Sequence, residues 1–161
     1  MKILVTGGNS RLATALKKYI EGDFLGRDKL DLSNKDHIDR LGTYDCIIHT
    51  AARTPSMNEN LEILFSKTHA KKIFLFTSKQ GTFLNWRQPG NMEYGLEKLT
   101  MNFIVYRHNM ETHNAQLIEP GQMDDEQQYD RIAKKFADTY EDWQFTKNMI
   151  YDMDVDRYIG F

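Results

Sequence analysis

The chain has no long apolar segment and no marked excess of positive charge. None of its apolar runs approaches the ~20 residues that a membrane-spanning helix needs. The apolar start, Ile3-Leu4-Val5, is too short for the core of a signal peptide. The net charge of −2 gives no global positive field, so nucleic acid and anionic membranes gain little from overall electrostatics. We therefore expect a cytoplasmic protein that binds small molecules, and neither nucleic acid nor membranes.

Cysteine, internal repeats, low-complexity tracts and linkers are also scarce or missing. The one cysteine, Cys46, lies in an apolar run, which predicts a buried and inert thiol. His108 and His113 flank Glu111 without the i,i+4 histidine pair of a helical zinc site, so no metal is expected. A chain of 161 residues can bury roughly 70% of its unfolded surface as one domain. We expect residues 1–161 to form a single domain with no separate substrate-binding domain.

Apolar segments of two kinds alternate along the chain. Residues 3–6, 46–49, 73–76 and 115–118 are short apolar runs typical of buried parallel strands. Helical spacing of apolar residues marks segments 12–20, 61–68, 94–104 and 129–140. Segments 24–26 and 29–32 are brief extended candidates, Ser33 is a candidate helix cap, and an edge strand is expected after Trp143. This alternation predicts a doubly wound parallel α/β sheet.

A glycine turn, residues 6–13 with the sequence TGGNSRLA, joins the first strand to the first helix. In such a sheet, backbone N–H groups at this turn and the positive end of the helix dipole suit a pyrophosphate. Glycine permits close backbone approach, and the small Ala13 lets the helix pack on its strand. Two of the three glycines of the usual dinucleotide fingerprint are nevertheless missing.

Two arginines bear on the choice of dinucleotide. Arg11 starts the first helix and Arg27 follows the second extended segment, so both can approach an adenosine ribose carrying a 2′-phosphate. This favours NADP(H); the alternative is that both are solvated surface arginines. Asp28 and Asp31 leave NAD(H) open, because an acidic residue here can bind an unphosphorylated ribose, and Asp31 can instead border the adenine.

Tyr94 and Lys98 are spaced four residues apart in a helical segment and therefore share one face. Hydride transfer to a carbonyl needs a proton donor, and a nearby ammonium lowers the pKa of a tyrosine from about 10 toward neutrality. The spacing alone arises easily by chance. Its context supports it, because the preceding strand delivers Thr77 and Ser78 to the carboxyl edge of the sheet, where Ser78 can bind the substrate carbonyl.

These motifs together resemble the short-chain dehydrogenase/reductase superfamily, in particular its extended epimerase, dehydratase and sugar-reductase branch. The segments 26–33 and 44–52 look most like dTDP-4-dehydrorhamnose reductases, and the resemblance runs from residue 1 to about residue 121. It implies a Rossmann fold, with Tyr94 as general acid/base, Lys98 on the nicotinamide ribose and Ser78 orienting substrate. The cofactor site implied by the turn and the resemblance comprises Gly7, Asn9, Ser10, Arg11, Leu12, Arg27, Asp31, Leu32, Thr50, Ala51, Ala52, Tyr94, Lys98, Pro120 and Gly121.

The sequence also departs from this family. Ser10 and Ala13 stand where the family has glycines, and the chain ends where an extended member would build its sugar-nucleotide lobe. The family's additional asparagine has no secure counterpart, although Asn58 and Asn60 are candidates. Two hypotheses follow: an NADP(H)-dependent oxidoreductase acting on a small carbonyl or alcohol, or a catalytically degenerate dinucleotide-sensing or protein-interaction module. Because family members commonly dimerise through the tyrosine-bearing helix, a homodimer or homotetramer is expected.

Overall fold

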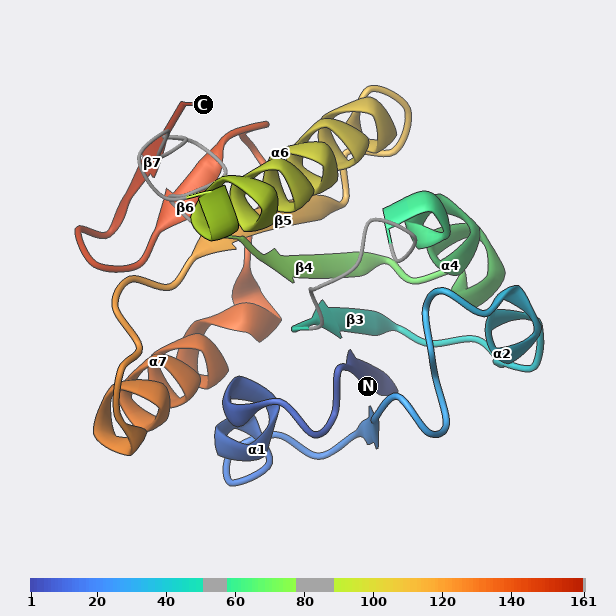
Figure 1. Ribbon diagram of the computed structural model, residues 1–161, viewed down its shortest axis with the longest axis horizontal. Helices are drawn as coiled ribbons and strands as arrows, with labels where there is room; N and C mark the ends of the chain where they lie inside the picture. The colour runs from blue at the N-terminus through green and yellow to red at the C-terminus, as the bar shows by residue number, and fades with distance from the viewer. Residues whose placement is uncertain (51–57, 78–88, 161) are drawn as a thin grey trace.

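One seven-stranded sheet forms the centre of the computed structural model, which describes residues 1–50, 58–77 and 89–160 (Figure 1). The strands are β1 (Ile3–Thr6), β2 (Asp23–Leu25), β3 (Cys46–His49), β4 (Lys72–Phe76), β5 (Ala115–Glu119), β6 (Ile150–Asp152) and β7 (Arg157–Ile159). The helices are α1 (Arg11–Leu16), α2 (Lys35–Asp39), α4 (Leu61–Thr68), α6 (Pro89–Asn109), α7 (Glu126–Thr139) and the 3₁₀ turn η1 (Tyr140–Asp142). Among the described residues, no helix combines the length and the hydropathy needed to cross a bilayer.

The strand order is β2-β1-β3-β4-β5-β6-β7, and every neighbouring pair is parallel except β6 and β7. This confirms the predicted doubly wound sheet. The segment after Trp143 supplies two strands, β6 and the edge strand β7, one more than the sequence predicts. Because β2 and β3 lie on opposite sides of β1, the strand order reverses there, and such folds bind ligands beyond the carboxyl ends of the strands at this point.

Two predictions near β2 are wrong. Residues 29–32 are not a strand. The Lys29 and Leu30 amides both donate to the Gly26 carbonyl in a turn, so they are not available for pairing with a neighbouring strand. Leu30 still enters the core, so its apolar character reflects burial from a loop. The α2 helix is capped by Asn34, whose side chain accepts from the Asp36 amide, and not by Ser33.

Helices cover both faces of the sheet, as Figure 1 shows, with α2, α4 and α6 on one side and α1 and α7 on the other. Residues of β3 alternate between two cores, Ile47 facing the first group of helices and Ile48 the second. The second core includes an edge-to-face contact between Phe74 and Phe136, whose ring centroids are 5.1 Å apart. Asp125 starts α7 with a capping box, in which its side chain accepts from the Gln128 amide.

Gly8 is the point where the first turn approaches β2 most closely. Its amide donates to the Leu25 carbonyl at 3.0 Å, and a Cβ at this position would lie 2.5 Å from the Phe24 carbonyl carbon. The backbone of β2 cannot move away without disturbing the sheet, so Gly8→Ala should lower the free energy of unfolding by about 1–3 kcal/mol. Urea denaturation measures this loss. Gly160→Ala is the matched control, because a Cβ there meets nothing within 4 Å; equal effects of the two substitutions would contradict the prediction.

Candidate functional site

The turn after β1 has the backbone geometry that the sequence suggests. Gly7 adopts a positive φ of 63°, and the Ser10 amide donates to the Gly7 carbonyl at 2.8 Å. The first backbone bond of α1 runs from Thr14 N to Ser10 O, so the N–H groups of Arg11 and Leu12 precede the helix's own ladder. These two donors, together with the tight glycine turn, form the part of the site that suits a pyrophosphate.

Ser10 partly fills this turn from within. Its Oγ accepts from the Ala13 amide at 3.0 Å and lies 2.9 Å from Thr50 Oγ1, which itself donates to the Thr6 carbonyl. Three amides of the first helical turn, those of Arg11, Leu12 and Ala13, precede the backbone hydrogen bonds of α1, and Ser10 Oγ caps the last of them. The same contacts bring Thr50, a predicted cofactor residue, from the end of β3 to the first turn. Asn9 is exposed beside Ser10, with its amide group against Gly26.

The two arginines of the predicted ribose site lie in different environments. Arg11 donates through Nε and Nη2 to Glu126 of α7 and lies over the Tyr129 ring. Its guanidinium therefore joins α1 to α7 and already has a carboxylate partner. Arg27 lies on the surface, with Nε 3.6 Å from the Asp31 carboxylate, which is longer than a hydrogen bond. Hydrogen bonds from Ser33 hold the pKa of Asp31 below its usual value, with a smaller contribution from Arg27.

Leu32, the next predicted cofactor residue, belongs to the core. Its side chain packs among the residues under α2 and α4, and its carbonyl accepts from Asn60 at 2.8 Å. Any contact with a nucleotide would therefore need a rearrangement of this segment. Ser78, Ala51 and Ala52 lie outside the described residues, so their predicted roles remain predictions.

Tyr94 and Lys98 lie together on α6, as their spacing predicts. The Lys98 Nζ is 5.7 Å from the centroid of the Tyr94 ring and donates to the Phe76 carbonyl, at the end of β4, at 3.0 Å. The helix thus places both side chains over the carboxyl edge of the sheet. Asn58 fixes the helix there by donating from Nδ2 to the Glu97 carbonyl at 2.9 Å.

Burial controls the chemistry of the Lys98 amine. The residue is only 3% exposed, and loss of solvent lowers its pKa to about 8, although the charges of Glu119 and then Glu97 oppose that shift. A lysine with this pKa changes from its charged to its neutral form close to neutral pH, whereas an exposed lysine stays charged up to about pH 10.4. The arrangement can therefore support proton transfer by Tyr94 and respond to pH itself.

Buried polar side chains form a layer between the carboxyl edge of the sheet and α6. Besides Lys98 the layer contains His49, Thr77, Asn102, Glu119 and Asp152, each less than a tenth exposed. Thr77 Oγ1 donates to Asn102 Oδ1 at 2.8 Å, and within the described part of the chain Asn102 Nδ2 has no acceptor. The sequence interpretation gave none of His49, Asn102, Glu119 and Asp152 a functional role. Three of them could have been noticed from the sequence, because His49, Glu119 and Asp152 are each the polar last residue of a strand. Asn102 lies on α6 and gave no such signal.

His49 is the neutral member of this layer. Its Nδ1 lies 2.8 Å from Thr6 Oγ1, and burial, followed by the nearby Lys98 charge, lowers its pKa to about 3. The side chain therefore stays uncharged at every pH at which the protein would normally work. A neutral imidazole beside Lys98 avoids a second buried cation.

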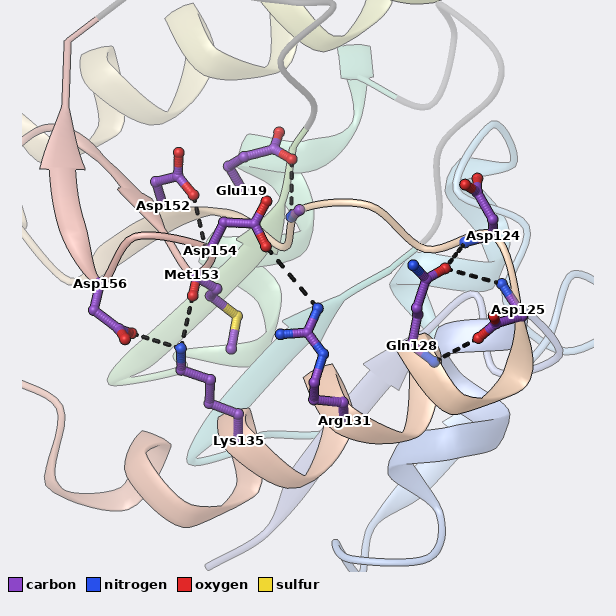
Figure 2. A network of polar contacts seen from close by, with 11 residues as sticks. Glu119, Asp124, Asp125, Gln128, Arg131, Lys135, Asp152, Met153, Asp154 and Asp156 are labelled. Carbon is purple, nitrogen blue, oxygen red and sulfur yellow. Dashed lines mark hydrogen bonds and ion pairs between the residues drawn. The ribbon is translucent and has the colours of Figure 1, made fainter.

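The loop after β5 is anchored to the β6–β7 hairpin. Gly121, with φ of 88°, donates its amide to Glu119 Oε1 at 3.0 Å, and a Cβ at Gly121 would overlap the Asp154 carboxylate. Figure 2 shows Lys135 and Arg131 of α7 directed at this hairpin, where Lys135 contacts the Met153 carbonyl and the Asp156 carboxylate. Pro120 is buried. The predicted cofactor residues Pro120 and Gly121 are therefore held at the same edge of the sheet as Lys98.

Comparison with family models gave no match, and comparison with curated protein sequences gave none either. Solved structures do match. The protein lin1944 from Listeria innocua has a TM-score of 0.68 at 16% identity over 95% of this chain and 99% of its own. A protein described as a small-chain dehydrogenase has a TM-score of 0.73 at 14% identity over 96% of this chain and 97% of its own.

A larger protein shares the same core. A GDP-L-fucose synthetase from Naegleria fowleri, bound to NADP, has a TM-score of 0.58 at 19% identity over 73% of this chain. The match spans about half of that protein, 49% of its length. At these identities the similarity establishes the fold alone, a doubly wound α/β fold.

Proposed function

We propose that this protein is an NADP(H)-dependent oxidoreductase of the short-chain dehydrogenase/reductase type that acts on a small carbonyl or alcohol. The observation that carries the proposal is the Tyr94–Lys98 pair, which α6 holds over the carboxyl edge of the sheet with the amine 5.7 Å from the phenol ring. The same fold holds NADP in the Naegleria fowleri synthetase, which supports a nicotinamide dinucleotide here.

The residues present fit such a cofactor. Gly7 gives the turn its positive φ and Gly8 lets it pack closely on β2. Within the described part of the chain the Arg11 and Leu12 amides precede the hydrogen bonds of α1 and are available to the diphosphate. Lys98 and the Pro120-Gly121 loop are at the same edge and would face the nicotinamide half. The cofactor would supply the hydride, so the chain itself needs only to bind, orient and move a proton.

Tyr94 would carry that proton. In the reducing direction its phenol gives a proton to the oxygen of the carbonyl that becomes an alkoxide, and the Lys98 ammonium stabilises the resulting phenolate. In the oxidising direction the phenolate takes the proton from the alcohol. Ser78 is proposed to orient the substrate oxygen.

Titration of the purified protein with NADPH and NADH, followed by a screen of small carbonyl compounds, tests the proposal. Binding together with NADPH-dependent reduction supports the oxidoreductase. Binding without turnover on any carbonyl favours the dinucleotide-sensing module, and failure to bind either nucleotide contradicts both. Isothermal titration calorimetry measures the first step and loss of NADPH absorbance the second.

The preference for NADP(H) is proposed to depend on Arg27. Its guanidinium is exposed and only loosely paired with Asp31, whereas Arg11 is bound to Glu126. Because a charge-assisted bond to phosphate stabilises a complex substantially, Arg27→Ala should weaken NADPH binding about tenfold and leave NADH binding nearly unchanged. Lys29→Ala removes an exposed cation from the same turn and serves as the control. An equal loss for both nucleotides would contradict this role.

The homodimer or homotetramer stays a prediction. Leu96 and Phe103 of α6, and Met110 directly after its last residue, recur every seven residues and are exposed, which supports self-association along this helix.

A further inference from the structure

Lys98 and Glu119 are both buried charges in the layer under α6. The lysine is 3% exposed and the glutamate 5%. A buried ammonium is costly unless an opposite charge compensates for the water it has lost. The Phe76 carbonyl supplies one hydrogen bond to Lys98 but no charge. Two carboxylates, first Glu119 and then Glu97, oppose this loss of solvent through their charges.

The register of the sheet places Glu119 on the correct side. Leu75 and Leu117 are paired across β4 and β5 and both face the α6 side of the sheet. Side chains alternate along a strand, so Thr77 and Glu119, two residues further on, face the same way. Thr77 confirms this direction by its hydrogen bond to Asn102, one helical turn beyond Lys98.

The strand ends also hold Glu119 close to the lysine. Phe76, whose carbonyl binds Lys98, is paired with Ile118, the residue immediately before Glu119. Neighbouring strands are about 4.8 Å apart, so the carbonyl that binds the amine and the residue that carries the carboxylate lie on adjacent strands at the sheet edge. A bond from the Gly121 amide to Oε1 fixes the carboxylate, as Figure 2 shows.

We propose that Glu119 is a positioning residue whose buried carboxylate keeps Lys98 in its cationic form beside Tyr94. This inference rests on the proposed function, since it assigns Glu119 an effect on Tyr94 through Lys98. Glu119 itself touches neither substrate nor cofactor in this role. Without its charge, the amine would lose its proton within the working pH range and stop stabilising the phenolate.

Other charged or titratable groups lie around Lys98. His49 of β3, and Tyr94 and Glu97 of α6, are near its amine, and Asp152 of β6 lies one strand beyond Glu119. His49 is neutral, and Glu97 is partly exposed, so solvent screens its charge. Asp152 accepts from the Asp154 amide and faces Glu119 in register. Glu119 is therefore expected to dominate the protonation of Lys98.

NMR titration of the apo protein labelled with ¹³C at lysine Cε tests this directly. The Lys98 signal, assigned by its absence in Lys98→Met, should titrate near pH 8, well below the other lysines. Glu119→Gln should lower this midpoint by roughly one pH unit or more. Glu97→Gln is the matched control, because it removes a carboxylate from the residue adjacent to Lys98, and it should cause a smaller shift.

Two results would overturn the proposal: a Glu119→Gln midpoint within about 0.3 pH unit of wild type, or an equal shift in Glu97→Gln. If Glu119→Gln unfolds, the double variant Lys98→Met/Glu119→Gln decides, because removing both charges should restore folding. A double variant that stays unfolded would count against the pairing.

The titration needs neither nucleotide nor substrate, so it separates this inference from the proposed function. A Lys98 shift in a protein that binds no nucleotide would leave the charge pair intact and remove the oxidoreductase. Where NADPH-dependent turnover is found, Glu119→Gln should also move the pH–rate profile downward by the same amount as the NMR midpoint. A profile that does not move would exclude an effect on Tyr94.

Discussion

Tyr94→Phe should lower kcat for NADPH-dependent carbonyl reduction by about 10²–10⁴-fold, which is the usual contribution of a positioned general acid. The substitution removes the phenolic hydroxyl and keeps the ring beside Lys98. NADPH affinity should consequently change little. Steady-state absorbance assays measure kcat, and calorimetry measures the dissociation constant, on whichever carbonyl the screen identifies.

Tyr106→Phe is the control for this experiment. Tyr106 lies on the same helix twelve residues further on, and burial raises its pKa to about 12, so it cannot act as an acid or base near neutrality. This variant should keep the wild-type kcat. If Tyr94→Phe also retained it, the phenol would not be the proton donor.

Acid should destabilise the protein through His49. The folded state holds this histidine neutral with a pKa of about 3, whereas the unfolded chain takes up the proton near pH 6.5. Stability is therefore full above pH 6.5 and falls as the pH drops toward 3, because the unfolded state binds more protons in that window. The loss from this group alone should reach about 2 kcal/mol at pH 5.

His49→Asn isolates this effect. Its amide can replace the contact of His49 Nδ1 with Thr6 but does not titrate. Urea denaturation at pH 7 and pH 5 should show a smaller pH-dependent loss in this variant than in wild type, by the same ~2 kcal/mol. His113→Asn, a change at an exposed histidine, should keep the wild-type dependence. An unchanged dependence in His49→Asn would show that the buried imidazole does not drive the acid loss.

The main strands were predictable because their apolar runs are uninterrupted. Parallel strands covered by helices on both faces leave no polar alternation, and the segments ending at His49 and Phe76 have this character. The segment 29–32 misled the interpretation because Leu30 is apolar for another reason, burial from a turn. A local pattern records that a side chain is buried but not which backbone conformation carries it.

The site divides in the same way. Tyr94 and Lys98 were predictable because their spacing on one helix is a local property. Glu119 and His49 come from strands separated by the β4 and α6 segments, and nothing in either local sequence shows that both approach Lys98. Likewise, only the packing of α1 on α7 reveals that Arg11 is bound to Glu126.

The sequence by itself determined the alternation of the main strands and helices from β1 to α7, the glycine turn after β1 and the pairing of Tyr94 with Lys98, because each depends on residues close together in the chain. The tertiary structure alone decided which charges share the buried layer under α6. Burial removes the solvent that would otherwise screen those charges, and it results from the packing of four strand ends and a helix, which no single segment encodes.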